Sequence, residues 1–456
     1  MKQKKDWLRK ASKRKLKGKD RGIVDFMRIC YHFFQELPMW ISEMADPRNT
    51  SYTTYTQADY IYMGILKNVC SVESMSQMEE KFNEEECINT LRILSGDERL
   101  EEMPHKDSLN YYLMKLSPEC LAGLRKKMIA KLLRNKTFHN HRLCGKYWRI
   151  ILDGTGLFCF KEKHCENCLV SVKKTEDGKT IKRYYHKVLE AKLVLAPNLV
   201  LSIDTEFIEN ERENVGKQDC EVSAAKRLLV RLKKDFPRLP IVIQGDALYA
   251  AEPIMAICRK NGWRYLFTHK AERQPGLDEG FRWIEMWDGG TEVRNIGKEC
   301  GTGMFINHVE EIAGKKETAN LYRYKFKEKG KDGEEKEICY MWLTDILLTP
   351  KNLEEMIEAG RGRWKIENEG FNTQKNIIYQ IEHLNSRDSN AMKNHYLLTQ
   401  IADILMQLYL AWNPLLRTAG QTIKNTSQAL LESFRRQTVT PEDVAYITTH
   451  TTVYLE

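Results

Sequence analysis

The feature that most constrains the fold of this chain is a change in its hydrophobic pattern near residue 147. Apolar residues in residues 22–140 recur about every 3.6 positions, as in Ile23–Phe34 and Leu113–Leu132, and this spacing predicts helices. Beyond residue 147, short apolar segments rich in β-branched residues alternate with helical ones. A chain of 456 residues is long enough for more than one domain. We therefore expect a helical domain followed by an α/β (α+β) domain.

The second part of the chain predicts five strands and two helices. The strands are expected at Tyr147–Phe160, Lys187–Leu195, Val200–Phe207, Leu239–Asp246 and Trp263–Thr268, with the first interrupted at Asp153–Gly156, and the helices at residues 219–235 and Glu252–Arg259. This order, β-β-β-α-β-α-β, indicates a three-strand meander followed by α/β alternation in a mixed sheet flanked by helices. If the first and fourth strands are neighbours, the acids that they carry meet.

Residues 272–345 depart from this alternation, since they are rich in Gly, Lys and Glu. Short β-like runs predict a β-rich insertion, at Trp283–Trp287, Met304–Val309, Leu321–Phe326 and Glu337–Leu343. Helical patterns return at Asn352–Glu358, Gly362–Ile378 and Met392–Leu410. The predicted organisation is a basic arm (1–21), a helical domain expected to bind DNA (22–146), a catalytic core (147–271 and 346–412) interrupted by the insertion (272–345), and a C-terminal segment of unknown role (413–456).

The positive charge of the chain is unevenly distributed. Residues 1–21 hold eleven Lys or Arg against two Asp, which accounts for the whole formal net charge of +9. Such an arm favours phosphate contacts, although a solvated, disordered tail is the alternative. Residues 121–150 hold nine bases and no acid, which favours positive charge beside Asp153 over a solvated helix face. Several short helices in residues 22–140 suit a helix-turn-helix-like reader, with Asp107 or Ser108 capping one of them, or an ordinary helical bundle.

Three acids fall where a metal site needs them. Asp153 lies within the first expected strand, Asp246 ends the fourth, and Glu367 lies on a helix after the insertion. Phosphodiester chemistry without a covalent intermediate is well served by two divalent ions held about 4 Å apart by carboxylates from rigid elements. The alternative is that these acids cap turns, as Asp before Gly or Ala often does.

Three segments resemble a known family. Tyr147–Gly156, Asp246–Ala250 and Gly360–Asn368, with its Arg-Trp-x-Ile-Glu-Asn pattern, resemble the DDE insertion-sequence transposases, whose RNase H-like core is interrupted by a β insertion before the glutamate. The resemblance covers roughly residues 145–412. It implies a cut-and-paste DNA transposase in which Asp153, Asp246 and Glu367 hold two Mg²⁺ (or Mn²⁺) ions. It also implies double-stranded DNA, at element ends and target, as partner, and a homodimer bound to that DNA.

The resemblance also implies residues that grip DNA. Arg363 would contact a transposon-end phosphate, and as the residue four positions before Glu367 it is expected on the same helix face. Tyr340 and Trp342 share one face of an expected strand, where either could stack a flipped base, or both could pack in the core.

Two positions depart from the family signature. Gly360 stands where the family has Tyr, and Gln374 stands where it has Lys. Lys375 follows directly, rotated by about 100° on an α-helix. These departures leave open an inactive copy that acts as a DNA-binding regulatory protein. A further rival is an RNase H-like nuclease that does not join strands.

The twelve cysteines occur in a chain without a secretory signal, so a disulfide framework is not expected. A possible zinc knuckle comprises Cys159, His164, Cys165 and Cys168, with His186 before the next strand. Only Cys165 and Cys168 have ligand spacing, and a basic loop with reduced thiols is the alternative. No uncharged apolar run reaches 18 residues, so we expect no membrane span and a cytoplasmic protein.

Overall fold

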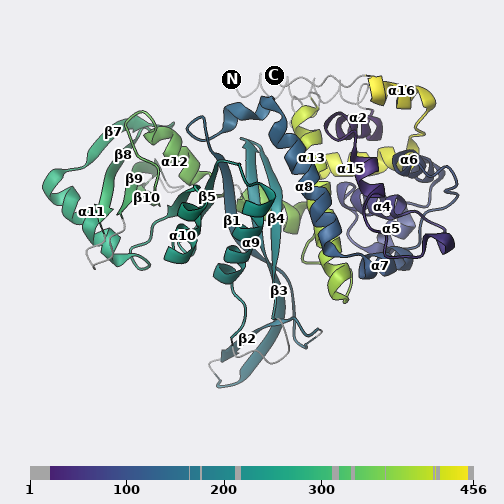
Figure 1. Ribbon diagram of the computed structural model, residues 1–456, viewed down its shortest axis with the longest axis horizontal. Helices are drawn as coiled ribbons and strands as arrows, with labels where there is room; N and C mark the ends of the chain where they lie inside the picture. Colours follow the sequence, from purple (N-terminus) through teal and green to yellow (C-terminus); the bar gives the residue numbers. More distant parts are fainter. Residues whose placement is uncertain are drawn as a thin grey trace.

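The protein is a mixed α/β structure in which one sheet of ten strands is flanked by helices (Figure 1). The computed structural model describes residues 21–163, 165–174, 177–210, 217–310, 318–329, 334–364, 366–413, 416 and 422–449. The strands are β1 (Trp148–Phe160), β2 (Leu169–Lys174), β3 (Thr180–Ala196), β4 (Leu199–Ile208), β5 (Ile241–Gly245), β6 (Arg264–Thr268), β7 (Thr291–Ile296), β8 (Gly301–Glu310), β9 (Thr318–Lys329) and β10 (Glu335–Thr344). They follow the order β2-β3-β1-β5-β6-β10-β9-β8-β7, and β4 pairs with β3.

The helices fall before, between and after the strands. Before β1 lie α2 (Ile23–Phe33), α3 (Leu37–Ser42), η1 (Thr50–Tyr52), α4 (Gln57–Val69), α5 (Met75–Lys81), α6 (Glu85–Ser95), α7 (Lys106–Lys115), α8 (Pro118–Arg134) and η2 (Lys136–His141). Between or after the strands lie α9 (Glu221–Asp235), α10 (Glu252–Lys260), α11 (Pro275–Asp288), α12 (Leu353–Arg361), η3 (Ile366–Phe371), η4 (Thr373–Ile377), α13 (Ser389–Trp412), α15 (Ile423–Arg436) and α16 (Pro441–Thr449). Among the described helices, none is long and apolar enough to cross a bilayer.

The centre of the sheet has the predicted strand order. β1, β3 and β4 form an antiparallel meander, and β5 and then β6 continue the sheet in parallel with β1. Helices α9 and α10 connect these strands as expected. β1 runs unbroken through Asp153–Gly156, whereas the sequence predicted an interruption there. The register of β1 against β3 shifts only later, between Gly156 and Cys159.

The segment after β6 continues the same sheet. β10 pairs antiparallel with β6, and β9, β8 and β7 follow outward, so the predicted insertion is joined edge to edge with the core. The strand predicted at Trp283–Trp287 is wrong, because both residues lie in α11. Their rings stack 6.3 Å apart on the exposed side of that helix, while Leu277 and Phe281 are buried on its other side.

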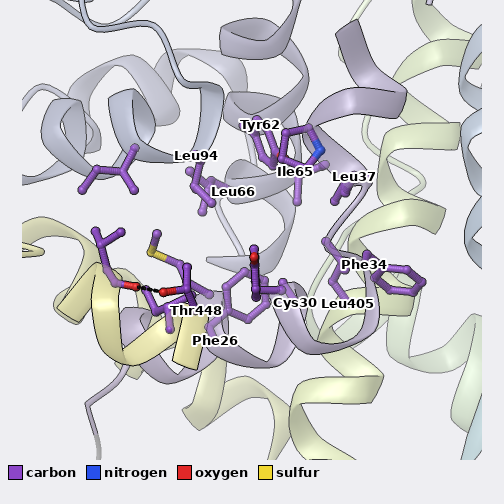
Figure 2. Close-up of a pocket in the computed structure, with 16 residues that line it drawn as sticks. Phe26, Cys30, Phe34, Leu37, Tyr62, Ile65, Leu66, Leu94, Leu405 and Thr448 are labelled. Atoms are coloured by element: carbon purple, nitrogen blue, oxygen red, sulfur yellow. Dashed lines mark hydrogen bonds between the residues drawn. The ribbon is translucent and has the colours of Figure 1, made fainter. Parts of the chain in front are cut away.

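The helices at both ends of the chain form one helical body beside the sheet (Figure 1). Helix α13 lies between the sheet and the other helices: it contacts α2, α4, α7 and α8, and also β4 (Figure 1). The C-terminal helices join the N-terminal ones, since α16 packs on α2 and α15 on α6. An apolar cavity of about 190 Å³ remains between α2, α4, α6, α13 and α16, and Figure 2 shows its lining. α7 begins at Lys106 with His105 as its cap, two or three residues before the predicted one.

The basic run of residues 121–150 is partly neutralised in the structure. Four of its nine bases, all on α8, pair with acids from distant segments. The ion pairs are Arg125 with Asp204, Lys126 with Asp235, Lys127 with Glu43, and Lys131 with Glu36. The Arg125 side chain is fully buried and donates to the Ser202 hydroxyl at 2.8 Å. Local composition could not show this, because the acids come from other elements. The basic arm lies outside the described residues except for Arg21, which pairs with Asp443.

Candidate active site

Asp153 lies on β1, and Asp246 directly follows the neighbouring strand β5. The parallel pairing of β1 and β5 matches Trp148 with Ile241 and, at its last pair, Ile151 with Gln244. Two residues further along both strands, the same register brings Asp153 alongside Asp246. The negative charge of Asp246 is accordingly one of the influences that raise the pKa of Asp153. Asp246 also caps a turn, since its Oδ1 accepts from the Leu248 amide at 2.8 Å.

The surroundings of Asp153 disfavour its ionised form. Burial raises the pKa of Asp153 from its ordinary 3.8 to about 6, against the lowering effects of the Arg363 cation and of the Gly154 amide, which donates at 2.9 Å. Asp246 and Glu221 raise that pKa further. The Arg363 guanidinium lies 3.6 Å from the Asp153 carboxylate. Three acids therefore share a partly buried site with two cations, Arg363 beside Asp153 and Lys187 beside Glu221.

Glu221 is the member of this group that the sequence did not single out. It lies in the first turn of α9, accepts a hydrogen bond from the Tyr249 hydroxyl at 2.8 Å and pairs with Lys187. A Cβ atom at Gly154 would come within 2.6 Å of the Glu221 carboxyl carbon, so a larger residue there would displace this carboxylate. Burial raises the pKa of Tyr249, as does the Glu221 charge, so this phenol stays a hydrogen-bond donor. No local pattern distinguishes Glu221 among the 63 acids of the chain.

Arg363 and Glu367 come from a break and restart in the helical backbone. α12 ends at Arg361, and the next helical segment, η3, is a π-helix that begins at Ile366. The two residues therefore do not occupy one regular α-helix, contrary to the sequence-based expectation. Ile366 packs in a hydrophobic cluster with Ile151. Because Ile151 and Asp153 share one face of β1, the η3 segment lies over the same face as Asp153.

Glu367 is exposed, and its carboxylate does not form a compact group with those of Asp153 and Asp246. Among the residues that the structure describes, no three carboxylates have ligand atoms all within 4.8 Å of one another. The structure therefore brings together Asp153, Asp246 and Arg363 of the predicted residues, with Glu367 on an adjoining segment.

The π-helical backbone also bears on Gln374 and Lys375. Gln374 is fully buried, and its amide donates to Gln400 at 3.1 Å and to Asp403 at 3.0 Å. Lys375 is half-buried and pairs with Glu382 at 2.7 Å. A π-helix takes more residues per turn than an α-helix. Lys375, eight positions after Glu367, therefore lies nearer to the helix face that the residue seven positions after Glu367 would occupy on an α-helix.

Gly360, Trp342 and Tyr340 form one packing unit. Trp342 is 4% exposed and stacks on Tyr322 with ring centroids 5.1 Å apart. A Cβ atom at Gly360 would lie 2.6 Å from the Trp342 ring, so a tyrosine at this position would clash. The structure thus gives Trp342 the packing role that the sequence left open, and base stacking would require it to leave this position. Tyr340 is half-exposed, 5.8 Å from Trp342, and is the better placed of the two to stack a base.

A second group of potential ligands lies away from the carboxylates. Cys165, Cys168 and His186 are the three residues, among those described, whose ligand atoms all lie within 4.8 Å of one another. Cys159 is exposed and outside this group. His164, the remaining residue of the predicted knuckle, lies outside the described residues.

Comparison with known proteins does not extend this description. No model of a known protein family matches the chain, and no curated protein matches it.

Proposed function

We propose that this protein is a DDE transposase, which cuts DNA at the ends of an insertion sequence and joins those ends to target DNA. The proposal rests mainly on Asp153 within β1 and Asp246 directly after β5, because the parallel register of these strands, continued by two residues, brings the two acids together. The meander β1-β3-β4 followed by β5 and β6 also supports an RNase H-like core. The helical body, with its N-terminal basic arm, is proposed to bind DNA.

The carboxylate site fits hard divalent cations. Its donors are carboxylate oxygens, which Mg²⁺ and Mn²⁺ prefer. Burial, with smaller contributions from the charges of Asp246 and Glu221, raises the pKa of Asp153 to about 6, and a bound cation would offset this cost of the ionised carboxylate. Asp153, Asp246 and Glu367 would hold the ions. Two such ions, when bound, would activate the attacking water or 3′-hydroxyl and stabilise the leaving oxygen.

Arg363 has a second role in this proposal. In the structure it neutralises Asp153. Once cations neutralise that carboxylate, the planar guanidinium is available for bidentate hydrogen bonding to a DNA phosphate. Lys375 would add a second phosphate contact, and Tyr340 would stack a base. Because two element ends must be cut and joined together, the working form is proposed to be a homodimer on double-stranded DNA.

The test is cleavage and joining of candidate end sequences by the purified full chain with Mg²⁺. Asp246→Asn should lower both rates on the order of 10²–10³-fold, the scale of losing one group that stabilises developing charge. Asp288→Asn is the matched control, because Asp288 is an exposed acid at the end of α11. Strand joining that survives Asp246→Asn would refute the assignment.

Two other results would replace the proposal with a rival. If the wild-type protein binds DNA but does not cleave it with any of the divalent ions tested, a regulatory protein with an inactive core is favoured. Cleavage without end specificity and without joining would favour an RNase H-like nuclease.

A separate measurement tests the phosphate contact. Arg363→Gln should reduce the slope of log binding constant against log salt by about one. Arg361→Gln is the control, because Arg361 lies two residues away and is held by Glu299 at 2.9 Å. Equal slopes in both variants would remove Arg363 from the DNA interface.

A further inference from the structure

Two thiols and an imidazole converge where β2, β3 and β4 meet. Cys165 Sγ lies 3.2 Å from Cys168 Sγ and 3.1 Å from His186 Nε2, and Cys168 Sγ lies 3.5 Å from the same nitrogen. Cys168 and His186 are buried, and Cys165 is half-buried. Cys165 and Cys168 belong to the turn before β2, whereas His186 lies on β3, so residues far apart in sequence supply one compact donor set.

The backbone of the turn that holds Cys165 and Cys168 directs amides at a sulfur atom, as in turns that bind a metal ion through cysteine. The backbone amides of Asn167 and Cys168 donate toward Cys165 Sγ. The Asn210 side chain donates to the Cys168 carbonyl at 2.9 Å, and the Asn210 amide donates to the Asn167 carbonyl at 3.1 Å. The turn is therefore fixed to the end of β4, with amides directed at the sulfur that would carry negative charge.

A carboxylate lies near Nδ1 of His186, the ring nitrogen that faces away from the two sulfurs. A Glu209 carboxylate oxygen lies 3.9 Å from His186 Nδ1, and Lys393 holds the other oxygen at 2.6 Å. Metal-bound histidines commonly have a carboxylate beyond the ring nitrogen that is not bound to the metal, which orients the ring. Nε2 faces the two sulfurs, so the ring is turned as coordination would need.

We propose that Cys165, Cys168 and His186 bind one zinc ion. Zinc prefers tetrahedral sites built from thiolate sulfur and imidazole nitrogen, and a soft S₂N donor set disfavours Mg²⁺ or Ca²⁺. These three side chains fill three of the four positions, and the partial exposure of Cys165 leaves the fourth to a water molecule. The site is independent of the proposed transposase chemistry, because it uses none of the carboxylates of that site.

The distances favour zinc over a disulfide between the two thiols. With zinc–sulfur bonds of about 2.3 Å, tetrahedral geometry sets two sulfurs about 3.8 Å apart. The observed 3.2 Å separation must grow by about 0.6 Å to admit the ion. A disulfide bond of about 2.05 Å would require the sulfurs to approach by more than 1 Å, and the turn is already tied to Asn210.

The ion would stabilise the base of the projecting hairpin that β2 and β3 form (Figure 1). It would connect the turn before β2 to His186 on β3, beside the pair Leu169–Tyr185. The outer part of this hairpin is exposed and carries Lys173, Lys174 and Lys182. Without the ion, this hairpin should open more often and become a substrate for trypsin.

The experiment measures zinc in the full chain purified under reducing conditions without chelator. We expect about one zinc ion per chain by elemental analysis, retained in Cys339→Ser and lost in Cys168→Ser. Cys339 is the matched control because it is an exposed free cysteine on β10. Cobalt substitution should produce thiolate-to-metal charge-transfer absorption in the wild type and in Cys339→Ser.

A second experiment uses the wild-type protein alone, so that its result does not depend on whether Cys168→Ser folds correctly. Chelator treatment of the wild-type protein should speed tryptic cleavage in residues 173–183, and added zinc, but not added magnesium, should restore protection. Less than about a tenth of a zinc ion per chain, or equal retention in Cys168→Ser, would overturn the proposal. So would a Cys165–Cys168 disulfide detected by mass spectrometry in the freshly purified protein.

Discussion

Replacing a partly buried residue usually destabilises a protein, but the raised pKa of Asp153 predicts that Asp153→Asn stabilises this one in the absence of metal. Burial with the neighbouring carboxylates raises the pKa of Asp153 from 3.8 to about 6. Each pKa unit corresponds to about 1.4 kcal/mol. The ionised side chain therefore costs the metal-free folded protein about 3 kcal/mol at pH 8. Asp153→Asn removes this charge with little change in shape, so it should stabilise the metal-free protein.

The sign and the pH window follow from linkage. Between about pH 4 and pH 6 the folded state binds the Asp153 proton more tightly than the unfolded state, so wild-type stability falls as pH rises through this window. The advantage of Asp153→Asn should accordingly be about 1.5 kcal/mol at pH 5 and about 3 kcal/mol at pH 8. A substitution that acted only through packing would give the same difference at every pH.

The assay is denaturant unfolding of the metal-free wild type, Asp153→Asn and the exposed control Asp288→Asn at several values of pH from 5 to 8. Added Mg²⁺ should stabilise the wild type and the control at pH 8 while leaving Asp153→Asn nearly unchanged. The reasoning is refuted if Asp153→Asn is less stable than the wild type at pH 8, or if its advantage does not grow with pH.

Two further substitutions test the packing that surrounds the site. Gly360→Ala forces a Cβ atom to within 2.6 Å of the Trp342 ring, so it should lower the free energy of unfolding by about 1–3 kcal/mol. Gly123→Ala is the control: Gly123 lies in α8 with open space around it, so this change should raise the free energy of unfolding by up to about 1 kcal/mol. Lys192→Met leaves the buried Asp403, now 3.7 Å from the Lys192 ammonium, without its cation and should cost about 3–5 kcal/mol. Adding Asp403→Leu to that variant should recover most of the loss, and additive losses in the double variant would contradict the pairing.

The sequence predicted the centre of the sheet because strand and helix signals there are local. β-branched runs bounded by turns give β1, β4, β5 and β6, and apolar spacing gives α9 and α10. It failed at Trp283–Trp287, where two tryptophans of high strand propensity lie on a helix. The buried Leu277 and Phe281, spaced four apart, mark the helical face that decides the conformation. It also missed β2, since its exposed residues lack an apolar pattern and its pairing with β3 is not a local property.

Sequence reasoning reached the aspartates of the site but not all of its surroundings. Asp153 and Asp246 could be paired in advance because the strands in or beside which they lie are neighbours in the predicted sheet. Glu221 could not, since its approach to Gly154 depends on how α9 packs against β3 and β4. The group of Cys165, Cys168 and His186 was visible only as one spaced cysteine pair, because the third donor comes from a different strand.

The two departures from the family signature have physical explanations that change their meaning. At residue 360 the space that a tyrosine would need is filled by the Trp342 ring, so glycine there belongs to the packing of α12 on β10. At residue 374 the glutamine amide faces inward to Asp403, and the π-helical backbone presents the following residue, Lys375, nearer the surface. Glycine at 360 and glutamine at 374 are therefore both explained by the side chains packed around them, Trp342 in one case and Asp403 in the other.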